Sequence, residues 1–219
     1  MSNILSETDL ASIEASVKEA ETRTSGEIVP FIVDRSASYP VASWRGGAIF
    51  GLVGLMTVVL LGQFYQGWSL GWLFTVGGTG FAAIVCAALG VLLVRSVSKI
   101  ERLFAGSTAI SQAVRDRSMR AFVEEEVFET RDRSGILIFI SLFEHRVEVV
   151  GDSGINASVQ PDDWVHVVED ILLGIRAGKM AEGIVKAINR CGGLLVEKGV
   201  EIKDDDSNEL SDSVRYSPD

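Results

Sequence analysis

The hydrophobic pattern of the chain has one dominant feature, a stretch of 49 residues without a charged side chain. It runs from Gly46 to Val94, so all 50 charged residues lie on the other 170. Two apolar runs, residues 46–62 and 70–94, fill most of this stretch, and about 20 residues of helix suffice to cross a bilayer. The pattern predicts a transmembrane helical hairpin. The alternative, a buried hairpin in a soluble core, would need a larger core than 170 residues can enclose.

The flanks of the hairpin predict its orientation. An aromatic turn over residues 63–69 joins the two runs, and two spans leave both flanking segments on the same side. The basic residues on the two flanks are Arg45, Arg95, Lys99 and Arg102. The positive-inside rule places such basic flanks in the cytoplasm. We expect a multi-pass membrane protein with a cytoplasmic soluble domain. Residues 1–43 show no pattern of a cleavable signal peptide.

The segment before the hairpin predicts one helix and one strand. Ser6 with Asp9 three residues later is typical of a capping box, and apolar residues then recur at helical spacing. Residues 27–34 form a run rich in strand formers that contains Pro30. Because proline cannot donate a ladder hydrogen bond, we expect this strand at a sheet edge or with a bulge.

The segment after the hairpin predicts alternating helices and strands. Residues 95–105 are amphipathic and are expected near anionic head groups. A helix over about 107–128 precedes residues 136–143, which are almost entirely apolar and therefore predict a central strand. Residues 146–150 alternate and predict a half-exposed strand joined to it by a tight turn.

Two further helices complete the domain. Pro161 fits the first position of one helix, and apolar residues from Met180 to Leu195 define the other. The predicted fold class is α/β: a small mixed sheet sandwiched by helices and interrupted by a two-helix transmembrane hairpin. Residues 1–43 and 96–200 are predicted to form the two parts of the soluble domain, and residues 44–95 the hairpin. Residues 201–219, which include Asp204 to Asp206, are predicted to form a disordered acidic tail.

Composition narrows the choice of partners. The 30 acidic and 20 basic side chains give a net charge of −10, which disfavours nucleic acid. The two cysteines are Cys86, within the second apolar run, and Cys191, on a predicted helix, so both are expected to be free thiols. The expected partners are the lipid bilayer and other membrane proteins.

Three short motifs are similar to those of a known family. They are residues 24–30 (TSGEIVP), residues 133–141 (RSGILIFIS) and residues 148–155 (EVVGDSGI), with Trp164 and Gly178 further along the chain. The sequence resembles the TPM domain family over most of residues 5–196, in particular a bacterial subgroup in which a hairpin interrupts the domain. The resemblance implies a sheet between helices, and acid phosphatase activity and calcium binding have been proposed within the family.

A group of carboxylates suggests a metal site. Asp152, Asp162 and Asp163 follow the third predicted strand, and Asp34 ends the first. Strand ends and helix starts can converge in such a sandwich, so Asp34, Asp152 and Asp163 are predicted ligands of one calcium-like ion. A simpler role for Asp162 and Asp163 is to stabilise the positive end of a helix.

Two hypotheses on function follow. The first is a membrane-tethered, non-catalytic accessory module that binds membrane or envelope proteins and assists their assembly or turnover. The second is a metal-dependent, phosphatase-like hydrolase, although neither His145 nor His166 belongs to a recognisable ligand pair. A converging carboxylate cluster favours the hydrolase, whereas an apolar surface groove favours the interaction module.

Overall fold

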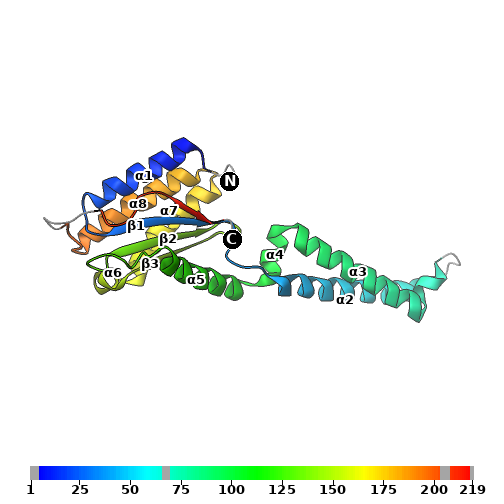
Figure 1. The fold of residues 1–219 in the computed structure, drawn as a ribbon. Coiled ribbons are helices and arrows are strands. Elements are labelled where there is room, and N and C mark those ends of the chain that lie inside the picture. Colours follow the sequence, from blue (N-terminus) through cyan, green and yellow to red (C-terminus); the bar gives the residue numbers. More distant parts are fainter. Residues whose placement is uncertain (1–4, 66–69, 203–207, 218–219) are drawn as a thin grey trace. The chain divides into compact units, whose positions relative to one another are not determined.

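The computed structural model describes residues 5–65, 70–202 and 208–217. The chain forms two compact units, one of residues 1–37 and 111–219 and one of residues 38–110. Residues 66–69 of the predicted hairpin turn and the acidic run Asp204 to Asp206 lie outside the described residues. Each unit is described by itself below (Figure 1).

The larger unit alternates helices and strands along the sequence. Its elements are α1 (Glu7–Glu21), β1 (Glu27–Val33), α5 (Ser107–Glu124, which begins in the smaller unit), β2 (Gly135–Ser141), β3 (Arg146–Gly151), α6 (Ser153–Ser158), the 3-10 helix η2 (Pro161–Trp164), α7 (Val165–Arg176), α8 (Met180–Glu197) and β4 (Arg215–Ser217).

The sheet has the strand order β3-β2-β1-β4. β1 runs parallel to β2 with Ile28 opposite Ile136, and β2 runs antiparallel to β3 with Ile136 opposite Gly151. All seven residues of β2 are buried, as expected for an apolar run with a strand on each side. The predicted central strand and its hairpin with β3 are confirmed.

Helices cover both faces of the sheet, which confirms the predicted α/β sandwich (Figure 1). Alternate residues of β1 and β2, among them Ile28 and Ile138, join one core cluster with α1, α7 and α8. The other alternate residues face α5. There the rings of Phe31 and Phe139 stack with centroids 5.8 Å apart, and the Arg117 guanidinium of α5 lies 5.6 Å from the Phe31 ring centroid.

Polar contacts fix the helices at a few points. The predicted capping box of α1 is present, since the Asp9 amide donates to Ser6 Oγ and the Ser6 amide donates to Asp9 Oδ2. Asp170 of α7 is buried and pairs with Lys186 and Arg190 of α8 at 2.7 and 2.6 Å. Burial alone would raise the pKa of Asp170, but the two cations lower it below the usual value.

The position of Pro30 corrects one prediction. β1 lies inside the sheet rather than at its edge, and all seven of its residues are buried. β4 begins opposite Phe31, the residue after Pro30, and pairs only as far as Val33. An interior strand tolerates the proline because the neighbouring strand on one side is short and starts beyond it.

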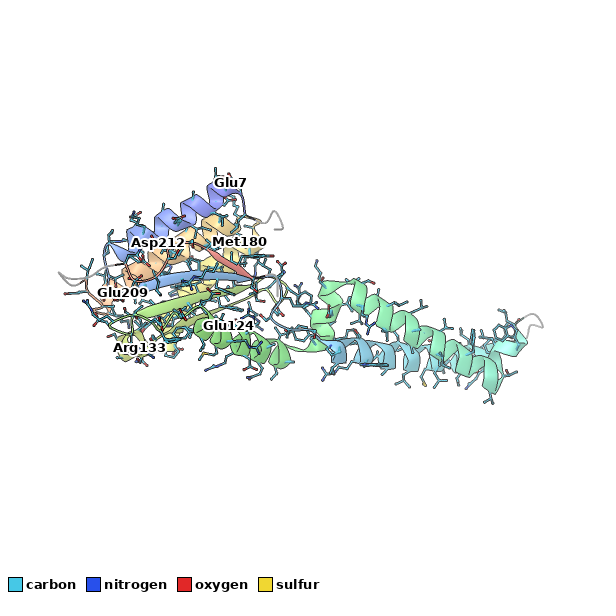
Figure 2. The ribbon with its side chains drawn as sticks, viewed as in Figure 1. Glu7, Glu124, Arg133, Met180, Glu209 and Asp212 are labelled. Atoms are coloured by element: carbon cyan, nitrogen blue, oxygen red, sulfur yellow. The ribbon has the colours of Figure 1, made fainter. Side chains whose placement is uncertain are left out.

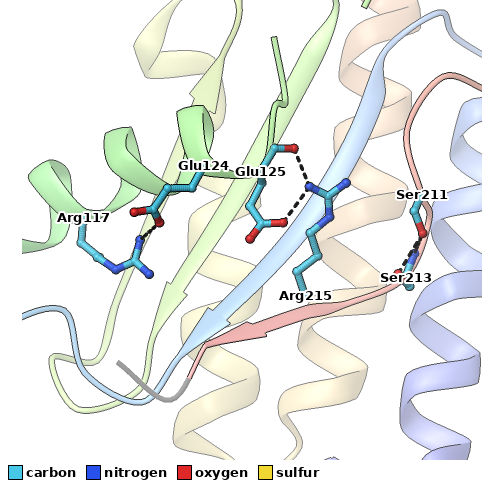
Figure 3. Close-up of polar contacts among 6 residues, drawn as sticks. All are labelled: Arg117, Glu124, Glu125, Ser211, Ser213 and Arg215. Atoms are coloured by element: carbon cyan, nitrogen blue, oxygen red, sulfur yellow. Dashed lines mark hydrogen bonds and ion pairs between the residues drawn. The ribbon is translucent and has the colours of Figure 1, made fainter. Parts of the chain in front are cut away.

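The C-terminal segment corrects a second prediction. Residues 201–219 were expected to form a disordered tail, but Arg215–Ser217 form β4 and pair in parallel with β1. The Nη1 of Arg215 donates to the Glu125 carbonyl at 2.7 Å and contacts the Glu125 carboxylate at 3.0 Å (Figure 3). The pairing with β1 and the ion pair with Glu125 hold β4 in place, although its sequence is polar and has no apolar pattern.

The smaller unit is a helical hairpin. α2 (Pro40–Phe64) and α3 (Val76–Ser96) are long and apolar enough to cross a membrane, with the 3-10 helix η1 (Gly71–Phe74) before α3 and the short α4 (Ser98–Ala105) after it. Small residues let the helices approach closely, because a Cβ at Gly90 would lie 2.6 Å from Phe50 Cβ. Large apolar side chains point away from the helix pair and are exposed, such as Ile84 at 70%.

The two cysteines follow the sequence-based expectation. Cys86 of α3 and Cys191 of α8 are both free thiols. Burial raises the pKa of the Cys191 thiol to about 12, so it stays protonated and behaves as a small apolar core side chain.

The buried centre of the sheet gives the first testable prediction. Ile138→Asp in β2 places an unpaired carboxylate at a fully buried position and should lower the free energy of unfolding by more than about 3 kcal/mol. Arg146→Asp, at an exposed position of β3, serves as the matched control. Urea unfolding of the detergent-solubilised protein measures both. Equal stability of the two variants would show that Ile138 is not in a core.

Candidate functional site

The three predicted ligand carboxylates do not form one site. Asp34 follows β1 at the end where Val33 lies opposite Ser141, whereas Asp152 follows β3 at the end where Gly151 lies opposite Ile136. The two residues are separated by nearly the whole length of the strands, roughly 20 Å at about 3.3 Å per residue. The prediction of one ion held by Asp34, Asp152 and Asp163 is therefore wrong.

Asp152 has a structural role at the start of α6. Its side chain is only 6% exposed, and its Oδ1 accepts a hydrogen bond from the Ser153 amide at 2.6 Å. Oδ2 lies 2.9 Å from Nε of Arg133, the cation that sequence reasoning did not pair with it. Asp152 is an N-cap residue whose charge is balanced by an arginine.

Asp163 has a similar local role. Its carboxylate accepts from the Gln160 amide at 2.8 Å and from Lys198 Nζ at 2.7 Å. These two bonds, the one from Lys198 first, lower the pKa of Asp163 below its usual value. The simpler reading of this acid as a helix-start residue describes it well.

Metal-ligating side chains do not gather elsewhere in the described part of the chain. Among residues 5–65, 70–202 and 208–217, no three His, Cys, Asp or Glu side chains lie close enough together to hold a metal ion. His145 lies in the turn between β2 and β3 with a φ of 51°, and His166 is exposed on α7 beside Glu169. Calcium binding itself stays a prediction.

A buried hydrogen-bond network closes the sheet end near Asp34. The Glu144 carboxylate is buried and accepts from the Ser36 amide at 3.1 and 3.2 Å and from the Ser141 hydroxyl. The hydroxyls of Ser36 and Ser141 are 2.9 Å apart. The network joins the loop after β1 to the turn after β2 and satisfies a carboxylate that would otherwise be costly to bury.

An apolar groove lies along the free edge of β3. It has a volume of about 750 Å³, and consecutive residues 147–151 of β3 line it. Side chains of one strand alternate between the two faces of a sheet, so a groove lined by consecutive residues runs along the strand's edge. Met119 of α5 forms part of one wall, and Trp164 with Val165 and Val168 forms part of the other.

The walls of the groove come from elements on opposite faces of the sheet. α5 covers one face of the sheet, whereas Trp164 of η2 and the buried residues of α7 belong to the core on the other face. Residues of all three elements line the groove along β3. Met119 is 48% exposed and Val165 is 47% exposed. Exposed apolar side chains that gather beside a concave surface mark binding sites more often than isolated ones do. We take this groove as the candidate functional site.

A second pocket lies at the opposite edge of the sheet and is acidic. It has a volume of about 220 Å³ and is lined in part by Glu21, Glu27 and Asn208. Glu21 Oε1 accepts from the Ile28 amide at 2.9 Å, and its Oε2 is buried close to Asp212.

The acidic pocket seats the C-terminal segment. The carboxylate of Glu27 is buried and accepts from the amides of Glu209 and Leu210 at 3.3 Å, while Glu209 accepts from the Arg131 amide at 2.9 Å. Figure 2 labels Glu209 and Asp212 on this segment. Burial, with the nearby charges of Glu27 and Asp212, raises the pKa of Glu21 to about 8. The hydrogen bonds at this pocket therefore hold the chain's own C-terminal segment, and we assign the pocket a structural role.

Comparisons with known proteins agree with the fold. The architecture defines the chain as an α/β sandwich domain into which a helical hairpin is inserted. A family model described as the TPM domain matches residues 91–194. The chain contains a TPM domain, and the resemblance noted from its motifs is confirmed.

One solved structure has the same fold along nearly the whole chain. It is the NMR structure of BA42 protein from the psychrophilic bacterium Bizionia argentinensis, with a TM-score of 0.59 and 18% identity over 99% of this chain and 98% of that one. At this identity the similarity shows the fold. The chain matches no curated protein.

The raised pKa of Glu21 gives a testable prediction on pH. A carboxyl that ionises at about 4.5 when unfolded but at about 8 when folded makes the folded state bind more protons between these values. Stability from this group is fully present below pH 4.5, is lost as the pH rises through about 8, and levels off above that.

Glu21→Gln should remove that part of the pH dependence. The amide keeps an acceptor for the Ile28 amide and cannot ionise, so the variant should melt at least about 2 °C above the parent at pH 8. Glu19→Gln, at an exposed position of the same helix, is the matched control. The prediction fails if the melting temperature changes with pH between pH 5 and pH 8 in the same way for all three proteins.

Proposed function

We propose that this protein is a membrane-tethered accessory module, in which the α2–α3 hairpin anchors the TPM domain to the bacterial plasma membrane. The domain binds other membrane or envelope proteins and assists their assembly or turnover. The observation that carries this proposal is the apolar groove along β3, an open concave surface that no other described part of the chain fills.

The anchor is supported by the composition and exposure of the hairpin. No charged residue lies between Gly46 and Val94, and the apolar side chains of α2 and α3 are exposed along both helices, including Leu52 at 61% and Leu89 at 59%. A bilayer would cover this surface, and the exposure of so large an apolar surface to water is unfavourable. Two spans then place both termini on one side of the membrane.

Basic residues at one end of the hairpin support a cytoplasmic domain. Arg45 near the start of α2 and Arg95 at the end of α3 lie at the same end of this antiparallel pair. Arg45 Nη1 donates to the carbonyls of Phe104 and Ala105 at 3.0 and 3.2 Å and so caps the end of α4. The capped helix carries Lys99 and the exposed Leu103, a pairing suited to a membrane surface.

No observation favours the phosphatase-like alternative to the same degree. The carboxylates considered for it, Asp34 and Asp152, lie at opposite ends of the sheet, and Asp152 and Asp163 are engaged by Arg133 and Lys198. We therefore assign them no step of hydrolysis, and the interaction module is the function that the geometry supports best.

The topology is tested with reporter fusions. A reporter that is active only outside the cytoplasm should be inactive when fused after residue 219 and active when fused after Tyr65, which lies between the two spans. Activity of the fusion at residue 219 would contradict the cytoplasmic placement of the domain.

The role of the groove is tested by partner capture from solubilised membranes. Met119→Asp combined with Val165→Asp puts two charges on opposite walls of the groove and should reduce recovery of specific partners by about tenfold. Val123→Asp with Leu173→Asp is the matched control, since these residues lie on the same two helices outside the groove and are 59% and 58% exposed. Quantitative mass spectrometry compares both with the parent. Equal recovery by both double variants would exclude the groove as the binding surface.

A further inference from the structure

The backbone of β3 has a defined set of groups that face away from the sheet. The Asp152 amide donates to the Gly135 carbonyl at 2.9 Å, and the register pairs Val150 with Leu137 and Glu148 with Phe139. In an antiparallel pair, residues that bond to the partner strand alternate with residues whose amide and carbonyl point outward. The outward groups of β3 therefore belong to Val147, Val149 and Gly151.

Most of these outward groups lack a partner within the described residues. The Gly151 carbonyl accepts from Asn156 Nδ2 at 2.6 Å, which closes one end of the edge. No hydrogen bond from residues 5–65, 70–202 or 208–217 meets the outward groups of Val147 and Val149. These four backbone groups form a ladder segment that is open toward the groove.

The outer side of β1 shows how this chain itself supplies partners for a strand's outward backbone groups. Along β1, the side chain of Glu21 accepts from the Ile28 amide, and β4 adds as a parallel strand opposite residues 31–33. Arg215 anchors that strand through Glu125 (Figure 3). An extended segment thus adds along the outer side of β1, whereas the equivalent bonding groups of β3 are unmet within the described residues.

The groove around the open edge favours an extended occupant. A helix satisfies its own backbone groups and has nothing to offer the amides of Val147 and Val149, whereas an extended segment pairs with both. Such a segment would place alternate side chains toward Met119 on one wall and toward Trp164 and Val168 on the other. Apolar residues therefore suit the alternate positions that face Trp164 and Val168, and the positions between them face the wall of Met119 and Arg115, where a polar residue can also be placed.

The charged residues of the groove favour a basic segment. Glu148 and Glu169 contribute two carboxylates, and Arg115 contributes one guanidinium. The excess negative charge lies beside the path of the open edge. A lysine or arginine at one polar position of the segment would complement it, and a glutamate would be repelled.

We propose that the β3 groove binds an extended segment of a partner protein, which adds to β3 as a further strand. The segment has alternating apolar side chains and a basic residue among its polar positions. This inference rests on the proposed function and specifies the kind of partner that the interaction module recognises.

Synthetic peptides test the inference on the full-length protein in detergent. The probes are fluorescent peptides of about eight residues, a typical strand length, with valine or isoleucine at alternate positions and lysine, glutamine or glutamate at one polar position. Fluorescence anisotropy should give the tightest binding for lysine and the weakest for glutamate. A peptide of the same sequence with N-methyl groups on one strand edge should bind about tenfold more weakly, since it cannot pair with β3.

A matched pair of protein variants tests the edge itself. Val149→Pro removes an outward amide without touching the bonds to β2, whereas Val149→Thr keeps both the amide and the β-branched shape. The proline variant should bind the lysine peptide about tenfold more weakly than the threonine variant, which should match the parent. The N-methyl peptide leaves the protein unchanged, so the test holds even if the proline variant is unstable.

The outcomes separate this inference from the proposed function. Equal affinity for methylated and unmethylated peptides, or absence of any peptide binding, overturns strand addition. If membrane partners are then still lost on charging the groove at Met119 and Val165, the interaction module stands and its partner binds in another form. If partner recovery is also unaffected, both proposals fail together.

Discussion

The pairing of β1 with β2 is the interaction on which the rest of the structure depends. The two strands lie 108 residues apart in sequence, yet every residue of both is buried in the middle of the sheet. Each large apolar side chain buried there contributes about 1.5–3 kcal/mol. The chain can therefore carry an inserted hairpin only if both ends of the insertion return to the same sheet, which they do at Val33 and before Gly135.

This pairing also determines where the polar residues lie. Because β1 is parallel to β2 and β3 is antiparallel, the end of β1 and the end of β3 are at opposite ends of the sheet. Asp34 is therefore placed beside the Glu144 network and Asp152 beside Arg133. The arrangement therefore separates the carboxylates that the sequence suggested as ligands of one ion. The candidate site lies instead along the outer edge of β3.

Much of the fold follows from local patterns in the sequence. The apolar run of β2, the capping box of Ser6 and the charge-free stretch each predict one kind of local structure, and the strand, the helix start and the long apolar helices are found where these patterns lie. The alternation in residues 146–150 also indicated a half-exposed strand, and this was the one signal in the sequence for the groove.

The remaining features depend on contacts that no local pattern encodes. Pro30 can lie in an interior strand because β4 is short and pairs only with residues 31–33 of β1. β4 itself is held by its pairing with β1 and by the contact of Arg215 with Glu125. The spacing of Asp34 and Asp152 does not reveal whether their strands run parallel or antiparallel. Likewise, Met119 and Trp164 come from different helices and meet only at the edge of the assembled sheet.

The central claim is that the outer side of β1 is closed by the chain itself, through Glu21 and β4, whereas the outer side of β3 is open for a partner. Hydrogen exchange, followed by mass spectrometry, can compare the protein in native membranes with the purified protein in detergent. The account predicts that the amides of Val147 and Val149 exchange more slowly in native membranes, while those of residues 31–33 exchange equally in both samples. Equal exchange at Val147 and Val149 in the two samples would contradict it.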